Sequence, residues 1–123
     1  MERGGGKIIN ISSVRASYGT RGGMVDYCAS KGAVDALTRQ LAVEWASQKV
    51  YVNAISPTVV ETGFTTSILT DPVAAASLIQ RIPLGRWAQP EDLVGPVLFF
   101  ASQASDYVTG QIMFVDGGLT AVV

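Results

Sequence analysis

Three side chains near the start of the 123-residue sequence, Ser13, Tyr27 and Lys31, have types and spacing suited to acid–base chemistry. Tyr27 and Lys31 are four residues apart, so on a helix they would share one face and bring an ammonium group close to a phenol. A free phenol has a pKa near ~10, and a neighbouring cation favours the phenolate and lowers that pKa. Such a tyrosine could transfer a proton at neutral pH, with Ser13 holding the oxygen that receives it.

The elements expected around these residues are a strand, a helix and a second strand. Residues 7–12 form a short apolar run rich in β-branched side chains, which predicts a buried parallel strand. Residues 13–26 are rich in Ser, Gly, Thr and Arg and predict a loop. A helix is expected over residues 26–47, with Asp26 as its N-cap, and another buried strand over residues 50–56. This arrangement predicts a right-handed parallel βαβ unit.

The second half of the sequence predicts two more helices and a third strand. Residues 64–82 are weakly periodic, with a helix near residues 73–80, and the length of this stretch indicates a functional loop. A proline followed by two acidic residues predicts a helix from residue 90 to about 102, which Pro96 should kink or loosen. Residues 111–115 are expected to form the third strand.

The predicted topology places the candidate residues at one edge of a sheet. In an open parallel sheet, ligands bind beyond the carboxyl ends of the strands. Ser13 follows the first strand, Tyr27 and Lys31 open the helix whose N-terminus faces that edge, and residues 57–62 follow the second strand. We therefore expect all of them to line one cleft.

The composition narrows the classes of function. Only 15% of the residues are charged and 48% are hydrophobic, against ~25% charged in a typical domain, so we expect much of the surface to be covered by a further part of the chain, another subunit or both. A net charge of −1 without a basic cluster gives no support for nucleic-acid binding. The single cysteine excludes an internal disulfide framework, and the absence of histidine removes the commonest metal ligand, so no metal site is expected.

The sequence predicts neither a membrane span nor export. No apolar run approaches the ~18 residues that a membrane-spanning helix needs. Residues 1–4 lack the apolar core of a secretory signal. The expected location is the cytoplasm, which also suits a chain with one unpaired cysteine.

A set of short motifs gives the sequence a family resemblance. The motifs are Asn10-Ile11-Ser12-Ser13, Tyr27 to Ala33, Val52 to Pro57, Ile82 to Arg86, Pro90 to Leu93, Tyr107 to Gln111 and Val115 to Gly118. Together they resemble the short-chain dehydrogenase/reductase family over nearly the whole chain. Two features differ from the usual family pattern: Pro57-Thr58 stands in place of Pro-Gly, and the loop between Ser13 and Tyr27 is one residue longer.

The resemblance implies an α/β fold, namely the C-terminal half of a Rossmann-type doubly wound parallel sheet, with three strands and intervening helices. The complete domain would have three αβα layers. Residues 1–123 are then expected to be a partial single domain that carries the catalytic and C-terminal half. The dinucleotide-binding half, with its glycine-rich fingerprint, would be absent from this sequence.

The resemblance also implies hydride transfer between NAD or NADP and a carbonyl or secondary alcohol carbon. Tyr27 matches the general acid/base of the family. Lys31 matches the residue that lowers the pKa of that tyrosine and binds the nicotinamide ribose. Ser13 matches the hydroxyl that orients the substrate oxygen, with Ser12 as the alternative. The positions expected to contact the nicotinamide end of the cofactor are Tyr27, Lys31, Pro57, Val60 and Thr62.

The implied partner is a small carbonyl or alcohol substrate. Residues 42–46 look most like the gluconate and polyol dehydrogenase branch, which suggests a sugar acid or polyol, although β-ketoacyl carrier-protein reductases share almost every motif. The family commonly forms homotetramers through its long helix and its last helix and strand. Two alternatives stay open: an inactive chain that serves only as an oligomerisation or interaction module, or a gene fragment without function.

Overall fold

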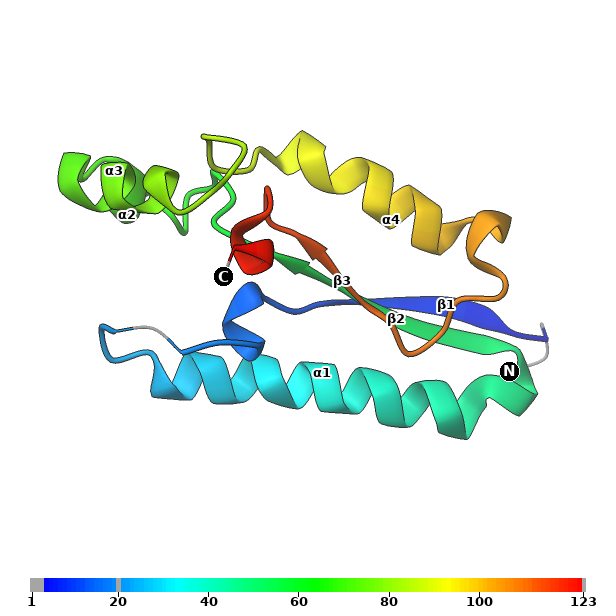
Figure 1. Cartoon of the computed structure of the whole chain (residues 1–123). Helices are drawn as coiled ribbons and strands as arrows, with labels where there is room; N and C mark the ends of the chain where they lie inside the picture. Colours follow the sequence, from blue (N-terminus) through cyan, green and yellow to red (C-terminus); the bar gives the residue numbers. More distant parts are fainter. Residues whose placement is uncertain (1–3, 20, 123) are drawn as a thin grey trace.

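The computed structural model describes residues 4–19 and 21–122, which form three layers. The middle layer is a parallel sheet with strand order β1-β2-β3, built from β1 (Gly6–Ile11), β2 (Val50–Pro57) and β3 (Ile112–Val115). Helix α1 (Val25–Trp45) covers one face, and α4 (Val94–Ala101) covers the other (Figure 1). The predicted α/β class, with three parallel strands and intervening helices, is confirmed.

Short helices connect these layers. Two of them, α2 (Thr66–Leu69) and α3 (Pro72–Gln80), lie beyond the carboxyl ends of the strands (Figure 1). The 3-10 helices are η1 (Val14–Ala16), η2 (Ala46–Gln48), η3 (Pro90–Leu93), η4 (Gln103–Ser105) and η5 (Leu119–Ala121). Among the described residues, no helix combines the length and the apolar character that crossing a membrane would require.

The core forms around the central strand. In β2, Val52, Ala54 and Ile55 are fully buried, because α1 and α4 cover both faces of this strand. Ala42 of α1 packs with Val52, and the partly buried Trp45 packs against the same cluster. The N-terminus of α1 points to the carboxyl edge of the sheet, so it brings its first turns to the candidate cleft (Figure 1).

The start of α1 differs from the sequence prediction. Met24, not Asp26, is the N-cap, it makes no side-chain cap bond, and Asp26 lies within the first turn. The reason is the preceding turn: Gly22 and Gly23 have φ angles of 112° and 71°, which let the chain enter the helix before it reaches Asp26. The Asp26 carboxylate still lies in the first turn, where the helix dipole favours a negative charge.

The predicted helix from residue 90 to about 102 is divided. Pro90–Leu93 form the 3-10 helix η3, and the α-helix α4 begins at Val94 and ends at Ala101. Pro96 therefore lies in the first turn of α4, where backbone N–H groups have no partner within the helix and proline is tolerated. In place of a disturbance at the proline, the structure shows a change from 3-10 helix to α-helix at Val94, before the proline.

Asn53 fixes β3 beside β2. Its side chain is buried, donates from Nδ2 to the Val108 carbonyl at 2.9 Å and accepts at Oδ1 from the Gln111 N–H at 3.0 Å. The hydroxyl of Thr109 accepts from the Val52 N–H at 3.0 Å. These bonds tie the turn before β3 to the central strand, so the motif residue Asn53 has a structural role.

Candidate active site

A cavity of about 240 Å³ lies at the carboxyl edge of the sheet. It is bounded by the end of β1 and η1, by the first turns of α1, and by the loop that follows β2. Every residue predicted to act in catalysis or cofactor binding lines it: Ser12, Ser13, Tyr27, Lys31, Pro57, Val60 and Thr62. The fold thus brings together residues that the sequence separates.

Ser13 is held at the start of η1. Its Oγ accepts a hydrogen bond from the Arg15 N–H at 3.2 Å, which makes Ser13 the N-cap of that helix, and the residue is 7% exposed. Accepting this bond leaves the hydroxyl hydrogen available as a donor. Ser12 is also buried, and its Oγ donates to the Lys31 carbonyl at 3.4 Å.

Tyr27 and Lys31 lie one helical turn apart on α1, on the side that faces the cavity. The Lys31 Nζ lies 5.8 Å from the centre of the Tyr27 ring. It donates to the Ile11 carbonyl at 2.9 Å, and this bond holds the ammonium group against the end of β1. Two further N–H donors of Lys31 are left for other groups.

Thr65 shapes the loop that follows β2. It is buried, accepts from the Thr62 N–H at 3.0 Å and donates from Oγ1 to the Val60 carbonyl at 2.6 Å. Among the described non-glycine residues, only Lys49 has a positive φ angle, so the φ angle of Thr58 is negative. The loop therefore accepts threonine where the family usually has glycine.

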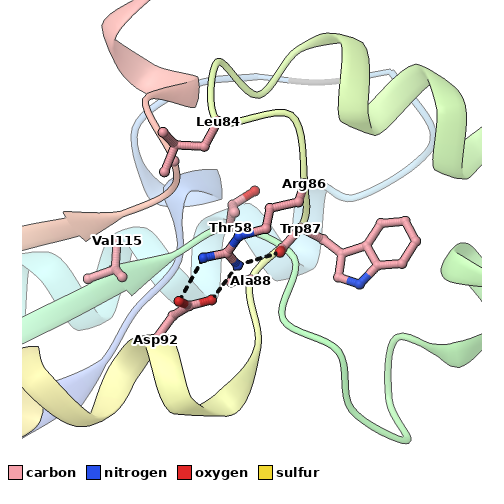
Figure 2. Close-up of a pocket in the computed structure, with 8 residues that line it drawn as sticks. Thr58, Leu84, Arg86, Trp87, Ala88, Asp92 and Val115 are labelled. Atoms are coloured by element: carbon pink, nitrogen blue, oxygen red, sulfur yellow. Dashed lines mark hydrogen bonds and ion pairs between the residues drawn. The ribbon is translucent and has the colours of Figure 1, made fainter.

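A second, smaller hollow of about 160 Å³ lies behind this loop. Figure 2 shows Arg86 facing Asp92 there, with the Trp87 ring pointing away from the pair. Two bonds join them, Nη1 to Oδ2 at 2.6 Å and Nη2 to Oδ1 at 2.9 Å. Together with the Gln89 N–H, Arg86 lowers the pKa of the Asp92 carboxyl to about 2. Arg86 thus pairs with an acid and does not line the cavity of the candidate site.

Glu61 joins the same loop to the segment before η3. Its Oε2 accepts from Gln89 Nε2 at 2.7 Å and from Trp87 Nε1 at 2.9 Å. These two hydrogen bonds lower the pKa of the Glu61 carboxyl, and the bond from Gln89 has the larger effect. The backbone adds a bridge between Val60 and Ala88. The loop is therefore held in place from outside the cavity.

The charged residues that line the cavity are all cations. They are Arg15, Lys31 and Arg81, and no carboxylate joins them within the described part of the chain. The sequence prediction identified Lys31 but not Arg15, Tyr18 or Arg81. Arg15 could have been noticed from its place two residues after Ser13, whereas Arg81 comes from the end of α3 and gives no such signal.

The described residues include no group of three or more histidine, cysteine, aspartate or glutamate side chains that could hold a metal ion. The Asp116 carboxylate caps a turn: it accepts from the Gly118 N–H at 3.0 Å and the Thr120 N–H at 2.8 Å. Burial raises the pKa of this carboxyl, but the hydrogen bonds outweigh burial and the net pKa is lowered.

Comparison with known proteins decides the family. The family described as "Enoyl-(Acyl carrier protein) reductase" matches residues 1–120. The chain belongs to the short-chain dehydrogenase/reductase family. Members of this family are oxidoreductases, and Ser13, Tyr27 and Lys31, which the sequence predicts to act in catalysis, all line the cavity.

Several members of this family are similar over nearly the whole chain. 5-Keto-D-gluconate 5-reductase of Escherichia coli is 42% identical over 100% of this chain and 48% of its own length. 2-Dehydro-3-deoxy-D-gluconate 5-dehydrogenase of the same species is 48% identical over 95% of this chain and 46% of its own length. The chain spans about half the length of the curated relatives it matches.

A solved structure agrees with the fold. The gluconate 5-dehydrogenase from Burkholderia cenocepacia, in complex with NADP and tartrate, superposes with a TM-score of 0.94 at 43% identity. The match covers 98% of this chain and 47% of that chain. The three-layer arrangement of Figure 1 is therefore that of a short-chain dehydrogenase/reductase over the matched region.

Proposed function

We propose that this protein is an NAD(P)-dependent oxidoreductase that transfers a hydride between a nicotinamide cofactor and a carbonyl or secondary alcohol carbon of a sugar acid. The observation that supports it best is the convergence of Ser13, Tyr27 and Lys31 on one cavity at the carboxyl edge of the sheet. The relatives named for gluconate and keto-gluconate support a sugar acid over a neutral polyol.

The cavity fits the nicotinamide end of the cofactor. Its lining offers hydroxyl and ammonium donors from Thr62 and Lys31, beside the apolar surface of Pro57 and Val60. When bound, the cofactor supplies or accepts the hydride at the substrate carbon. The lining is equally suited to NAD and NADP. The glycine-rich fingerprint that holds the rest of a dinucleotide is not among these 123 residues.

Each of the three proposed catalytic residues has one role in the reaction. For reduction, Tyr27 donates its phenolic proton to the carbonyl oxygen as that oxygen becomes an alcohol. The Lys31 ammonium, held by the Ile11 carbonyl beside the ring, stabilises the phenolate that remains. Ser13 donates its hydroxyl hydrogen to the same substrate oxygen. Its Oγ accepts from the Arg15 N–H, which leaves this hydrogen available to the substrate. Oxidation follows the reverse order.

We further propose that residues 1–123 form the catalytic and C-terminal half of the domain. Within the described part of the chain, the outer edge of β1 pairs with no other strand. Ile8 and Ile11 on this strand are 36% and 50% exposed. A further parallel strand from a dinucleotide-binding half would satisfy that edge and cover these side chains.

We propose homotetramer formation through α1 and α4. Leu37 and Val43 on α1 and Val94 and Leu98 on α4 are all more than half exposed, which is costly for a free surface. The test is light scattering on the purified protein, compared with a Val43→Glu, Leu98→Glu variant. A tetramer that dissociates in the variant supports the proposal, and a wild-type monomer contradicts it.

The test of the proposed activity is hydride transfer by the purified protein. 5-Keto-D-gluconate should be reduced at the expense of NADPH or NADH, with loss of the absorbance of the reduced nicotinamide. Cofactor binding without oxidation by this substrate or by neutral ketoses would contradict the proposed activity. That outcome, together with a tetramer, would favour the alternative of an inactive oligomerisation module.

A further inference from the structure

Two arginines and a tyrosine form a cluster in the cavity next to Ser13. Arg15 lies in η1, two residues after Ser13, and Tyr18 follows that helix. The Arg15 Cζ lies 5.2 Å from the centre of the Tyr18 ring, and the Arg81 Cζ at the end of α3 lies 5.9 Å from it. All three residues line the same cavity as Tyr27. The cluster has no role in the proton and hydride steps described above.

Two polar atoms of this cluster are buried without a partner. Arg15 Nη1 and the Tyr18 hydroxyl each expose less than 1 Å² and make no hydrogen bond to any described residue. Buried donors of this kind are nearly always satisfied in folded proteins, because leaving them unpaired is unfavourable. Both residues line the cavity, so a turn of these side chains towards a bound group there would give the two donors an acceptor.

The charge of the lining specifies the kind of acceptor. The sequence as a whole carries a net charge of −1, yet the charged residues of the cavity are Arg15, Lys31 and Arg81, with no described carboxylate among them. Lys31 is already held by the Ile11 carbonyl. The two arginines are therefore suited to an anion, and a guanidinium presents paired N–H groups that match a carboxylate.

We propose that Arg15 and the Tyr18 hydroxyl bind the carboxylate of the substrate, with Arg81 adding positive charge, so that the site takes keto and hydroxy acids in preference to neutral polyols. This inference rests on the proposed function. The Arg15 N–H donates to Ser13 Oγ, so one turn of the chain positions both the group that holds the reacting oxygen and the group that holds the carboxylate.

A cofactor phosphate shares the anionic chemistry of a carboxylate, so the experiment separates the two sources. Calorimetry on the purified protein measures the affinity for gluconate in the presence of NADPH, a pair that cannot react, with sorbitol as the neutral analogue and NADPH binding alone as a separate titration. The variants are Arg15→Gln, Tyr18→Phe and Arg81→Gln. The matched control is Arg39→Gln, which removes the same charge from an exposed position on α1 that does not line the cavity.

The expected result is selective. Arg15→Gln should weaken gluconate binding roughly 10- to 100-fold, and Tyr18→Phe roughly 3- to 10-fold, since each removes one charge-assisted hydrogen bond. Arg81→Gln should weaken it by less than Arg15→Gln. NADPH binding should stay within about 2-fold in every variant, and Arg39→Gln should match the wild type. Arg15→Lys should keep part of the affinity, because it keeps the charge but not the fork.

Other outcomes would overturn the carboxylate site. Sorbitol bound as tightly as gluconate, or gluconate bound equally well by wild type and Arg15→Gln, would show that the site ignores the carboxylate. Weaker NADPH binding in Arg15→Gln with unchanged gluconate binding would assign the cluster to the cofactor phosphate. These outcomes leave the proposed activity intact if hydride transfer persists. Selective gluconate binding without hydride transfer would instead contradict the proposed activity alone.

Discussion

Ser12 and Ser13 are neighbours at the end of β1, but their hydroxyls face different partners. The Ser12 hydroxyl donates to the Lys31 carbonyl at 3.4 Å, while Ser13 Oγ accepts from the Arg15 N–H at 3.2 Å. The Ser12 hydrogen is thus directed to the helix. The Ser13 hydrogen remains available to a ligand, which favours Ser13 as the residue that holds the substrate oxygen.

Substitution distinguishes the two serines. Ser13→Ala should lower kcat roughly 100-fold with little change in cofactor affinity, because a hydrogen bond to the reacting oxygen is lost. Ser12→Ala, the matched control, should lower kcat by less than about 3-fold, since its bond is long. Steady-state kinetics on both variants, with circular dichroism to verify the fold, gives the comparison. The opposite order would assign the role to Ser12.

Asp92 provides a test of the structure through pH. Its carboxyl has a folded pKa of about 2, below the ordinary 3.8, because Arg86 and the Gln89 N–H favour the charged form. A lowered folded pKa adds stability that is fully present above about pH 4 and is lost as the pH falls towards 2. The pair is partly exposed, so salt should weaken the effect.

NMR titration of the Asp92 carboxyl carbon measures this pKa directly. The wild type should titrate near 2. Arg86→Gln should raise the pKa towards 3.8, and the acid-induced loss of stability between pH 4 and pH 2 should become smaller. A control variant, Arg39→Gln, should leave it unchanged. A wild-type value close to 3.8 would show that the Arg86–Asp92 pair does not form in solution.

The sequence predicts the helices and strands accurately where the hydrophobic pattern determines their bounds, and less accurately where local backbone geometry determines them. The apolar run of residues 7–12 identified β1 to within one residue, but the expected burial was wrong: every residue of β1 is exposed or half-buried, because the outer edge of the strand has no described neighbour. The predicted start of α1 was wrong, because the turn at Gly22 and Gly23 overrides the capping preference of Asp26. The helix expected from residue 90 is divided at Val94, two residues before Pro96, where a 3-10 helix gives way to the α-helix.

The turn between α1 and β2 contains a residue whose backbone conformation the sequence does not predict. Lys49 has a φ angle of 57°, a left-handed conformation that side chains with a Cβ adopt at a cost. Its carbonyl accepts from the Gly6 N–H at 3.0 Å, so this conformation also places the start of β1. Strand pairing therefore maintains the unfavourable backbone angle.

Lys49→Gly should relieve this cost and raise the free energy of unfolding by about 0.5–1 kcal/mol, after the entropy of the more flexible unfolded chain is subtracted. Lys49→Ala keeps the Cβ and should change it by less than about 0.5 kcal/mol. Denaturant unfolding of the three proteins gives the comparison. Destabilisation by glycine, with no effect of alanine, would contradict the left-handed conformation.

For the whole molecule, the sequence predicted one convergent site but not all of its surroundings. Ser13, Tyr27 and Lys31 could be assigned from motifs, because parallel topology sends the ends of strands and the starts of helices to one edge. Arg81 could not be assigned, since only the folded arrangement brings the end of α3 beside Tyr18. The low charge content agrees with the exposed apolar side chains on α1 and α4.

The central claim is that Tyr27 is the proton donor of a hydride-transfer site. The most direct test is Tyr27→Phe, which removes only the hydroxyl and keeps the ring beside Lys31. NADPH affinity should stay within about 2-fold, while the rate of hydride transfer to 5-keto-D-gluconate in a single turnover should fall by roughly 100- to 10,000-fold. A variant that binds NADPH normally and transfers hydride at a near wild-type rate would contradict the assignment.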